Sequence, residues 1–493
     1  MNKLKIRKGI TYSLLLSQNR NMSITVKKGN ILIKKNNNIS DIWIEIDATI
    51  IKAILILIHG REINGFKINL KNKIISLNIE SLNEKNSLNE QRRNIPINFE
   101  KLKEDMSENS HIYSEIDTGT ENVVFDHRYP EIQGYRTKIG NNNSKEVALF
   151  EYIERISSFT IPQSTVIGTY DKLYENKDLI HPKDLGYAWA NKDLCKFDNN
   201  INIEWSPSYS LFNKKEILTP VQFSHYNYPN PLNRFIDGNS NGCALGSSLV
   251  EACLFGLLEF IERDTFIGYW YFDRFKMYEI DYSDQVYITK YQHYMKAKGY
   301  KLRFFYIENI YGLYTVWCLA INENDKGIYS VSGLSCKFSL NEAIKSSFEE
   351  VSGVLNSREK EKKIFEKIKE VESMKNVQEV STMDYIIYYY ASKKLVEKNL
   401  FFDLKDTPIV KYEEIEKPYL YTKSIEGDLN NILEAVKDRY YNVIYTDLTP
   451  GFLRKHNLYC VKVTGLGGYD MQFKIDIDRR PMKKYRSPIL PIA

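Results

Sequence analysis

The chain of 493 residues carries 68 basic and 63 acidic residues, a formal net charge of +5, and 43% hydrophobic residues. This content is ample for a large core, and the near balance of charge, without a sustained basic block, argues against a nucleic-acid partner. The longest apolar run, residues 48–58, is too short for a membrane span, which needs about 20 residues. We therefore expect a globular protein with one large and one smaller domain, and no membrane partner.

The six cysteines form no CxxC pair and show no metal-ligand spacing. This usage indicates reduced thiols, and a packing role is favoured over a nucleophilic one. The first 14 residues lack the apolar core and the cleavage site of a secretion signal, so the expected location is cytoplasmic. The seven histidines form no HxxxH or HExxH pattern, and nothing indicates a Ser-His-Asp or Cys-His centre.

The first 81 residues are predicted to form a small α+β module. Apolar runs at 23–26 and 31–33 flank Gly29-Asn30, which is a hairpin signal. The apolar patterning then predicts a strand at 43–46, a buried helix at 48–58 and a strand at 68–77.

A polar stretch separates this module from the rest of the chain. Between Leu82 and Ser110 the apolar content drops, and Asn, Glu, Lys and Ser dominate. Residues 82–124 are therefore predicted to be a polar linker. The predicted fold class is α+β, with a large mixed α/β domain at 125–493 preceded by the small N-terminal module.

An apolar-Glu-aromatic-Ile-Glu-Arg pattern occurs twice, at residues 150–155 and 258–263. Each copy places two carboxylates among large apolar side chains, where a buried charge is costly unless a positive group meets it. For one copy alone, pairing of the glutamates with arginines such as Arg155 and Arg263 is the favoured interpretation. The repetition favours a shared site for a hard cation.

The second copy lies in a predicted helix from Leu249 to Asp264. At about 100° per residue, Glu262 falls about 20° and Glu259 about 80° from Glu251, so three carboxylates share a face with large apolar residues. A solvated acidic face would mix with Lys and Ser, and this face does not. Magnesium bound to a nucleotide suits a few carboxylates together with phosphate oxygens.

A small, glycine-containing loop, residues 240–248, leads into this helix. Ser247 or Ser248 can cap the helix, with Glu251 completing a capping box. A helix N-terminus with free amides suits phosphate. By itself the loop is weak evidence, because many loops end in this way.

These residues together resemble the YcaO superfamily. Its nucleotide-binding core is similar to S-N-G-C-A-L-G-S-S-L-V-E-A at 240–252, followed by L-L-E-F-I-E-R-D at 257–264. The first ATP motif of the family resembles Glu151-x-x-Glu154-Arg155. Its central region resembles the stretch from Trp205 to Val221, and its late helix resembles the segment from Gly333 to Glu350. The resemblance covers about residues 125 to 493.

The resemblance implies a set of site residues. Magnesium would be held, directly or through water, by Glu151, Glu154, Glu259, Glu262 and Glu350. The residues implied to bind the nucleotide are Lys138, Ser247, Glu251, Lys345 and Glu350. The implied catalytic residues are Glu151, Glu154, Glu259, Glu262, Arg263 and Ala493.

The chain departs from the family pattern at three positions. Ser247 stands where the family usually has Asn, and Ser346, beside Lys345, stands where it often has Arg. The Gly-Lys-Gly that often precedes the first motif is present only as Lys138-Ile139-Gly140. These departures put the phosphate ligands at those positions in doubt, but not the glutamates.

The resemblance implies an ATP- and Mg2+-dependent cyclodehydratase. Such an enzyme phosphorylates backbone amides of a ribosomally made precursor peptide, so that Cys, Ser or Thr side chains cyclise to thiazolines or oxazolines. Two alternatives stay open. An external nucleophile would give a thioamide or an amidine, and a non-catalytic subunit would act as a leader-peptide-binding scaffold.

The implied partners follow from this chemistry. They are the precursor peptide with its leader, a leader-binding subunit and a flavin-dependent azoline dehydrogenase, while a homodimer stays open. Residues 1–81 loosely resemble winged-helix modules that hold leader peptides, and a plain stabilising appendage is an equal alternative. The tail from Arg486 to Ala493 has two prolines that favour an extended chain. We predict that Ala493 lies near the ATP glutamates.

Overall fold

The computed structural model describes residues 22–27, 30–35 and 38–39, and then most of the chain from 97 to 491. Within this second range the residues not described are 109–112, 118–120, 128, 130–131, 138–143, 160–164, 186–194, 196, 229–230, 237, 310, 325–326, 375–382, 399–403, 416–421, 423 and 472–489. The chain divides into two compact units, Met1–Ile95 with Lys417–Tyr421 and Pro96–Glu416 with Thr422–Ala493.

The described part of the first unit is a small antiparallel sheet. It contains β1 (Met22–Lys27), β2 (Asn30–Lys35) and β3 (Asn38–Ile39), in the order β1-β2-β3. Lys27 pairs with Asn30 across the turn, so the predicted hairpin is confirmed. The elements predicted at 43–46, 48–58 and 68–77 lie outside the described residues.

The second unit mixes helices and strands along the chain. Its strands are β4 (Tyr113–Asp117), β5 (Glu121–Asp126), β6 (Gln133–Thr137), β7 (Val166–Gly168), β8 (Ile203–Ser210), β9 (Lys215–Pro220), β10 (Cys243–Gly246), β11 (Lys276–Asp281), β12 (Tyr300–Glu308), β13 (Tyr314–Asn322), β14 (Ser330–Lys337), β15 (Ile409–Lys411), β16 (Asn442–Asp447) and β17 (Tyr459–Leu466). Its helices are α4 (Phe99–Glu108), α5 (Ser144–Ser157), α6 (Tyr170–Tyr174), the 3-10 helix η2 (Pro182–Leu185), α7 (Val221–Ser224), α8 (Leu249–Phe272), α9 (Val286–Ala297), α10 (Leu340–Glu359), α11 (Ile364–Ser373), α12 (Met383–Ala391), α13 (Lys393–Lys398), α14 (Tyr412–Ile415), α15 (Ile425–Ala435) and α16 (Gly451–Arg454).

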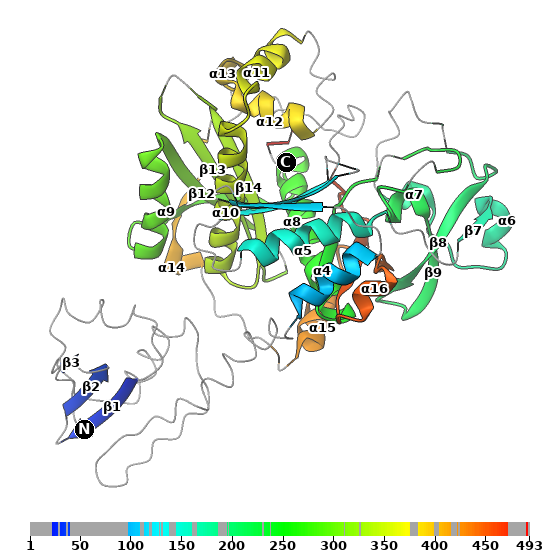
Figure 1. Ribbon diagram of the computed structural model, residues 1–493, viewed down its shortest axis with the longest axis horizontal. Coiled ribbons are helices and arrows are strands. Elements are labelled where there is room, and N and C mark those ends of the chain that lie inside the picture. The colour runs from blue at the N-terminus through cyan, green and yellow to red at the C-terminus, as the bar shows by residue number, and fades with distance from the viewer. Residues whose placement is uncertain are drawn as a thin grey trace. The chain divides into compact units, whose positions relative to one another are not determined.

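The described strands of this unit form three sheets. One sheet has the order β10-β17-β16-β8-β7, with β9 paired to β8, and the second has the order β14-β13-β12-β11-β15. The third is the small antiparallel sheet β4-β5-β6. Figure 1 shows α5 and α8 at the centre of the unit, with β12–β14 on one side and β7–β9 on the other. The predicted mixed α/β domain is confirmed.

The long helix α8 is buried around most of its circumference. Its apolar side chains pack against the sheet that contains β12, β13 and β14, and other residues contact β10 and β17. Ser248 caps its N-terminus by accepting a hydrogen bond from the amide of Glu251, as the capping pattern predicts. The helix ends at Asp273, which adopts a left-handed conformation with φ 48°. The carboxylates of α8 are therefore carried into the interior. No helix in the described part of the chain is long and apolar enough to cross a membrane.

The predicted linker at 82–124 is wrong from residue 99 onward. The helix α4 occupies Phe99–Glu108, and β4 pairs with β5 over Tyr113–Asp117. Leu102 and Met106, one helical turn apart, are fully buried against α5 and α16, and Asp105 pairs with His456 at 2.8 Å. Two apolar residues on one helix face are enough to dock a short helix, but they do not change the polar composition that suggested a linker.

The strand β6 packs closely between two helices. A Cβ added at Gly134 of β6 would lie 2.0 Å from the carbonyl oxygen of Ala148 and 2.4 Å from the amide of Tyr152, both on α5. On the other side, a Cβ added at Gly353 of α10 would lie 2.9 Å from the ring of Tyr135. Both contacts need glycine, so β6 fixes α5 and α10 relative to each other.

Gly134→Ala should therefore destabilise the protein by about 1–3 kcal/mol, because a helix backbone, not a movable side chain, must shift to admit the methyl group. Urea unfolding of the full chain measures the change. Gly451→Ala is the control, since a Cβ there meets nothing within 4 Å and alanine suits a helix better than glycine. Equal stability of the Gly134 variant and the wild type would refute the tight packing of β6.

Candidate functional site: glutamates from three helices

The first motif lies on α5 and faces two strands. Glu151 accepts a hydrogen bond from the amide of Tyr135 at 3.0 Å and another from Arg155 at 2.7 Å. Glu154 accepts a hydrogen bond from the amide of Leu245 on β10. Burial, Glu259 and Glu151 raise the pKa of Glu154 well above its ordinary value. The first motif is therefore in electrostatic contact with the second.

The second motif lies on α8. Glu262 accepts a hydrogen bond from the amide of Cys336 at 2.9 Å, and Arg263 lies 3.2 Å from it. Burial raises the pKa of Glu262 to about 8, even though Arg263 opposes the shift. Burial likewise raises the pKa of Glu259 to about 7, against the opposing charges of Arg263 and Lys462. One arginine does not neutralise these two carboxylates.

A third helix completes the cluster. Glu350 on α10 accepts a hydrogen bond from the amide of Leu334 at 2.9 Å. Burial raises its pKa, with Arg263 as the main opposing charge. The negative charge of Glu350 in turn raises the pKa of Glu259 and of Glu262. We define the glutamate cluster as Glu151, Glu154, Glu259, Glu262 and Glu350.

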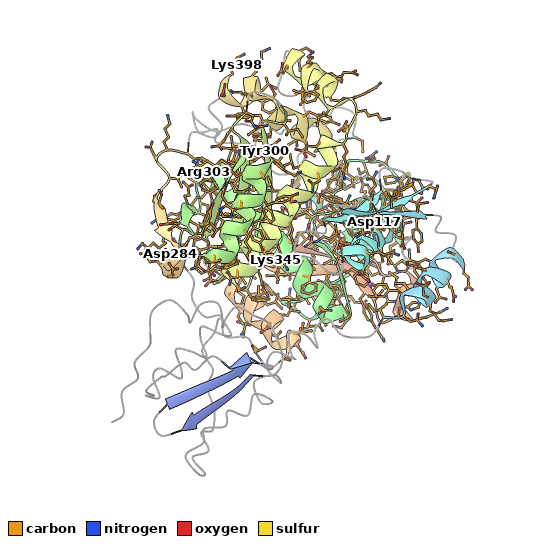
Figure 2. The ribbon with its side chains drawn as sticks, turned by 60° about the vertical axis from the view of Figure 1, so that its left-hand side comes forward. Asp117, Asp284, Tyr300, Arg303, Lys345 and Lys398 are labelled. Carbon is orange, nitrogen blue, oxygen red and sulfur yellow. The ribbon has the colours of Figure 1, made fainter. Side chains whose placement is uncertain are left out.

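The remaining predicted residues lie at different places. Glu251 accepts hydrogen bonds from both the amide and the hydroxyl of Ser247, at 2.7 and 2.5 Å, so these two residues bind each other at the start of α8. Lys345, labelled in Figure 2, is an exposed residue of α10 whose ammonium group lies 3.7 Å from Glu349. Lys138 and Ala493 lie outside the described residues.

The donor set of the cluster fits magnesium bound to a nucleotide. Within the described residues, no three His, Cys, Asp or Glu side chains converge on one point that could hold a metal ion. Nucleotide-bound Mg2+ needs only one or two carboxylates, because phosphate oxygens and waters complete its shell. Burial raises the pKa of these glutamates and so disfavours their charged form, and a divalent cation bound there would stabilise the carboxylates.

Sequence reasoning missed a buried cation beside the cluster. Lys462 of β17 is only 2% exposed and donates to the carbonyl oxygens of Asn239 and Asn241, at 2.5 and 3.0 Å. Asp470 accepts from the side chains of the same two asparagines. A single lysine within the apolar strand Tyr459–Leu466 was the available signal.

The two cysteines next to the second motif have the properties of packing residues and not of nucleophiles. Cys243 and Cys253, next to the second motif, are buried, and burial raises the pKa of both thiols, that of Cys253 to about 12. A thiol that stays protonated is a poor nucleophile at neutral pH.

Residues 140–465 match the family of YcaO cyclodehydratases, described as ATP- and Mg2+-binding. The chain belongs to this family. As a YcaO protein, it is a member of an ATP- and Mg2+-dependent enzyme family. A comparison with curated proteins finds no match.

Several solved structures share the YcaO fold of this chain. A "Heterocyclase in complex with substrate and Cofactor" has a TM-score of 0.59 and 19% identity, over 76% of this chain and 53% of that chain. YcaO from Methanopyrus kandleri bound with AMPPCP and Mg2+ has a TM-score of 0.53 and 16% identity, over 77% and 90%. The E. coli microcin synthetase McbBCD complex with pro-MccB17 bound has a TM-score of 0.52 and 15% identity, over 77% and 96%. This YcaO chain thus spans about half the length of the heterocyclase chain.

The raised pKa values predict how stability depends on pH in the absence of Mg2+. The folded protein keeps protons on Glu259 and Glu262 up to about pH 7 and 8. The unfolded chain releases them near the ordinary glutamate pKa of about 4.3. The free energy of unfolding rises with pH only where the unfolded state binds more protons than the folded state. Here the folded state binds more protons, so the free energy of unfolding should fall between about pH 5 and 8. The decrease should be up to about 1.4 kcal/mol per pH unit for each retained proton.

Urea unfolding at a series of pH values without Mg2+ measures this profile. Glu262→Gln should make the profile less steep, because one retained proton is removed, whereas Glu434→Gln, at an exposed ion pair with Lys437, should leave it unchanged. Mg2+ with ATP should restore stability at pH 8, because ligands that bind only the folded state stabilise it. A wild-type profile that is flat or rises through this range would contradict the charge assignment.

Proposed function

We propose that this YcaO protein is a cyclodehydratase that forms thiazolines or oxazolines in a ribosomally made peptide. The observation that carries the proposal is the glutamate cluster, a group of carboxyls from three helices whose charged form burial disfavours and which a bound Mg-ATP would stabilise. The cysteines beside it are protonated and buried. A site of this kind suits a reaction in which ATP, and no protein nucleophile, activates the substrate.

We assign the glutamates to magnesium and the loop before α8 to the nucleotide. Mg2+ would be bound, directly or through water, by Glu151, Glu154, Glu259, Glu262 and Glu350. The nucleotide would contact Lys138, Ser247, Glu251 and Lys345, and Arg263 would contact phosphate or a carboxylate. For Ser247 this role requires its hydroxyl to reach the nucleotide while Glu251 holds its amide. When bound, Mg2+ neutralises phosphate charge as the γ-phosphoryl group moves.

The proposed reaction has three steps. The thiol or hydroxyl group of a Cys, Ser or Thr side chain of the peptide loses its proton to water and adds to the preceding carbonyl carbon, so that the carbonyl oxygen becomes an alkoxide. That oxygen takes the γ-phosphoryl group of ATP, which leaves ADP. Phosphate then departs as the amide nitrogen loses its proton, and a C=N bond closes the ring. The protein itself would position the peptide and ATP and would place positive charge near the phosphate groups. Arg263 is a buried cation of the site that could do so.

The tail is proposed to take part in this chemistry. Leu490 is 4% exposed and packs in the apolar cluster that contains Trp270 and Leu334, and the carbonyl of Pro491 accepts a hydrogen bond from Ser332. Leu334 donates its amide to Glu350. This packing supports the proposal that Ala493, two residues beyond Pro491, reaches the glutamate cluster.

Two further assignments are proposals of the same kind. Residues 1–81 would hold the leader of the precursor, and a leader-binding subunit and a flavin-dependent dehydrogenase would be partners. The E. coli microcin synthetase complex, which shares this fold, has been solved with pro-MccB17 bound, and this supports a precursor substrate for the present chain. If the protein without residues 1–81 binds the precursor as tightly as the full chain, the module is only a stabilising appendage.

Glu259→Gln or Glu262→Gln should weaken Mg-ATP binding and lower turnover by about a hundredfold or more, because each removes a carboxylate that would hold the metal as it stabilises the transition state. Calorimetry with Mg-ATP and an ATPase assay measure the two effects. Glu434→Gln serves as the surface control. Unchanged affinity together with normal ATPase activity in either variant would remove these residues from the site.

Mass spectrometry of the cognate peptide identifies the product. Azoline formation should remove the mass of one water per ring, and deletion of residues 488–493 should abolish this loss without unfolding the protein or preventing ATP binding. Full conversion by the shortened enzyme would refute the role of the tail. A mass gain equal to the replacement of oxygen by sulfur would favour the thioamide alternative, and an intact peptide with ATP binding preserved would favour the scaffold.

A further inference from the structure

Strand β6 connects the two outer helices of the glutamate cluster. Its Tyr135 amide donates to Glu151 on α5, and the side chain of the next residue, Arg136, points to α10, where it pairs with Glu349. Glu349 precedes Glu350 of the cluster, and the positive charge of Arg136 opposes the burial that raises the pKa of Glu350. A single strand therefore brings a guanidinium group to the edge of the site.

The hydrogen-bonding capacity of Arg136 is only partly used. Its Nη2 donates to Glu349, whereas its Nε–H is buried and has no hydrogen-bond partner among the described residues. A guanidinium group carries five N–H donors, and a buried donor without an acceptor carries a desolvation cost. An acceptor that is absent from the protein would relieve this cost.

The pairing of Glu349 is also incomplete. Its side chain is 3% exposed, and its Oε1 has no hydrogen-bond partner in the described part of the chain, although the ammonium of Lys345 lies 3.7 Å away. The other two arginines of the site each contact a cluster glutamate, Arg155 at 2.7 Å and Arg263 at 3.2 Å. Arg136 differs from them, because it bonds a glutamate outside the cluster and keeps an unused donor.

We propose that Arg136 binds phosphate oxygens of ATP, with Glu349 holding its guanidinium plane in position. The planar fork of arginine matches phosphate geometry and forms charge-assisted hydrogen bonds, which are about twice as strong as neutral ones. The rigid packing of Gly134 against α5 keeps the strand, and with it Arg136, at a fixed distance from the cluster. The proposal rests on ATP binding and not on the amide chemistry proposed above.

A purely structural role makes a different prediction. If Arg136 only neutralises Glu349, then removal of the carboxylate should make the arginine dispensable. The variants Arg136→Gln, Glu349→Gln and the double variant separate these roles, and Arg136→Lys keeps a positive charge without the planar fork. Arg454→Gln, at a surface ion pair with Asp447, is the matched control.

Calorimetry of the full chain with Mg-ATP, Mg-ADP and adenosine provides the readout, and thermal unfolding verifies that each variant is folded. Arg136→Gln should weaken Mg-ATP binding about 10- to 100-fold and leave adenosine binding unchanged, since charge-assisted contacts to phosphate are lost. The affinity of Arg136→Lys should fall between those of Arg136→Gln and the wild type. Glu349→Gln should lose less affinity than Arg136→Gln, because the guanidinium remains but is positioned less well. The double variant should bind as weakly as Arg136→Gln.

Two results would overturn the proposal. One is a wild-type affinity for Mg-ATP in Arg136→Gln or in the double variant, because the arginine would then only neutralise Glu349. The other is an equal loss of affinity in Arg136→Gln and Glu349→Gln. No peptide is present in these measurements, so failure of the cyclodehydratase assignment would leave their result unchanged. If the wild-type chain bound no Mg-ATP, the nucleotide site and the role of Arg136 would both be wrong.

Discussion

The burial of several carboxyl groups close together is the constraint around which the large unit is built. Three helices, α5, α8 and α10, bring five glutamates to one region. Burial raises the pKa of Glu154, Glu259 and Glu262, and the charge of a neighbouring glutamate adds to each shift. Such a cluster opposes folding unless the rest of the structure holds the helices in place. The sheets on either side of α8 and the tight packing of β6 supply this restraint.

Main-chain amides, more than ion pairs, hold the glutamates. The amides of Tyr135, Leu245, Leu334 and Cys336 each donate to one carboxylate of the cluster. An amide fixes the position of a carboxylate, and it contributes only a dipole and no net charge. Amides thus orient four of the five glutamates, while Glu151 and Glu262 each also contact an arginine. This combination suits a site whose missing charge arrives with Mg2+.

The sequence predicts α8 well and the supporting elements poorly. The cap at Ser248 and the contact between Glu251 and Ser247 are local, so three or four residues are enough to predict them. Lys462 has only a weak local signal, a single lysine in an apolar strand, and Arg136 has none, because the strands β17 and β6 bring them to glutamates of other helices, Glu259 and Glu350, far along the chain. The helix α4 is not predicted for a different reason: its composition is mostly polar, and its apolar pattern is limited to two buried residues.

The helix α8 itself shows how a structural carboxylate differs from the cluster. Asp264 is fully buried and receives two hydrogen bonds from Arg439, one from the Tyr440 hydroxyl and one from the Tyr469 amide. Glu262, half a turn away, receives one amide bond and one contact from Arg263, and its pKa is raised to about 8. When nothing external is expected, the fold surrounds a buried charge with donors. Glu262 has fewer donors around it than Asp264, although both residues lie on α8. This difference is the physical reason to place a cation at the cluster.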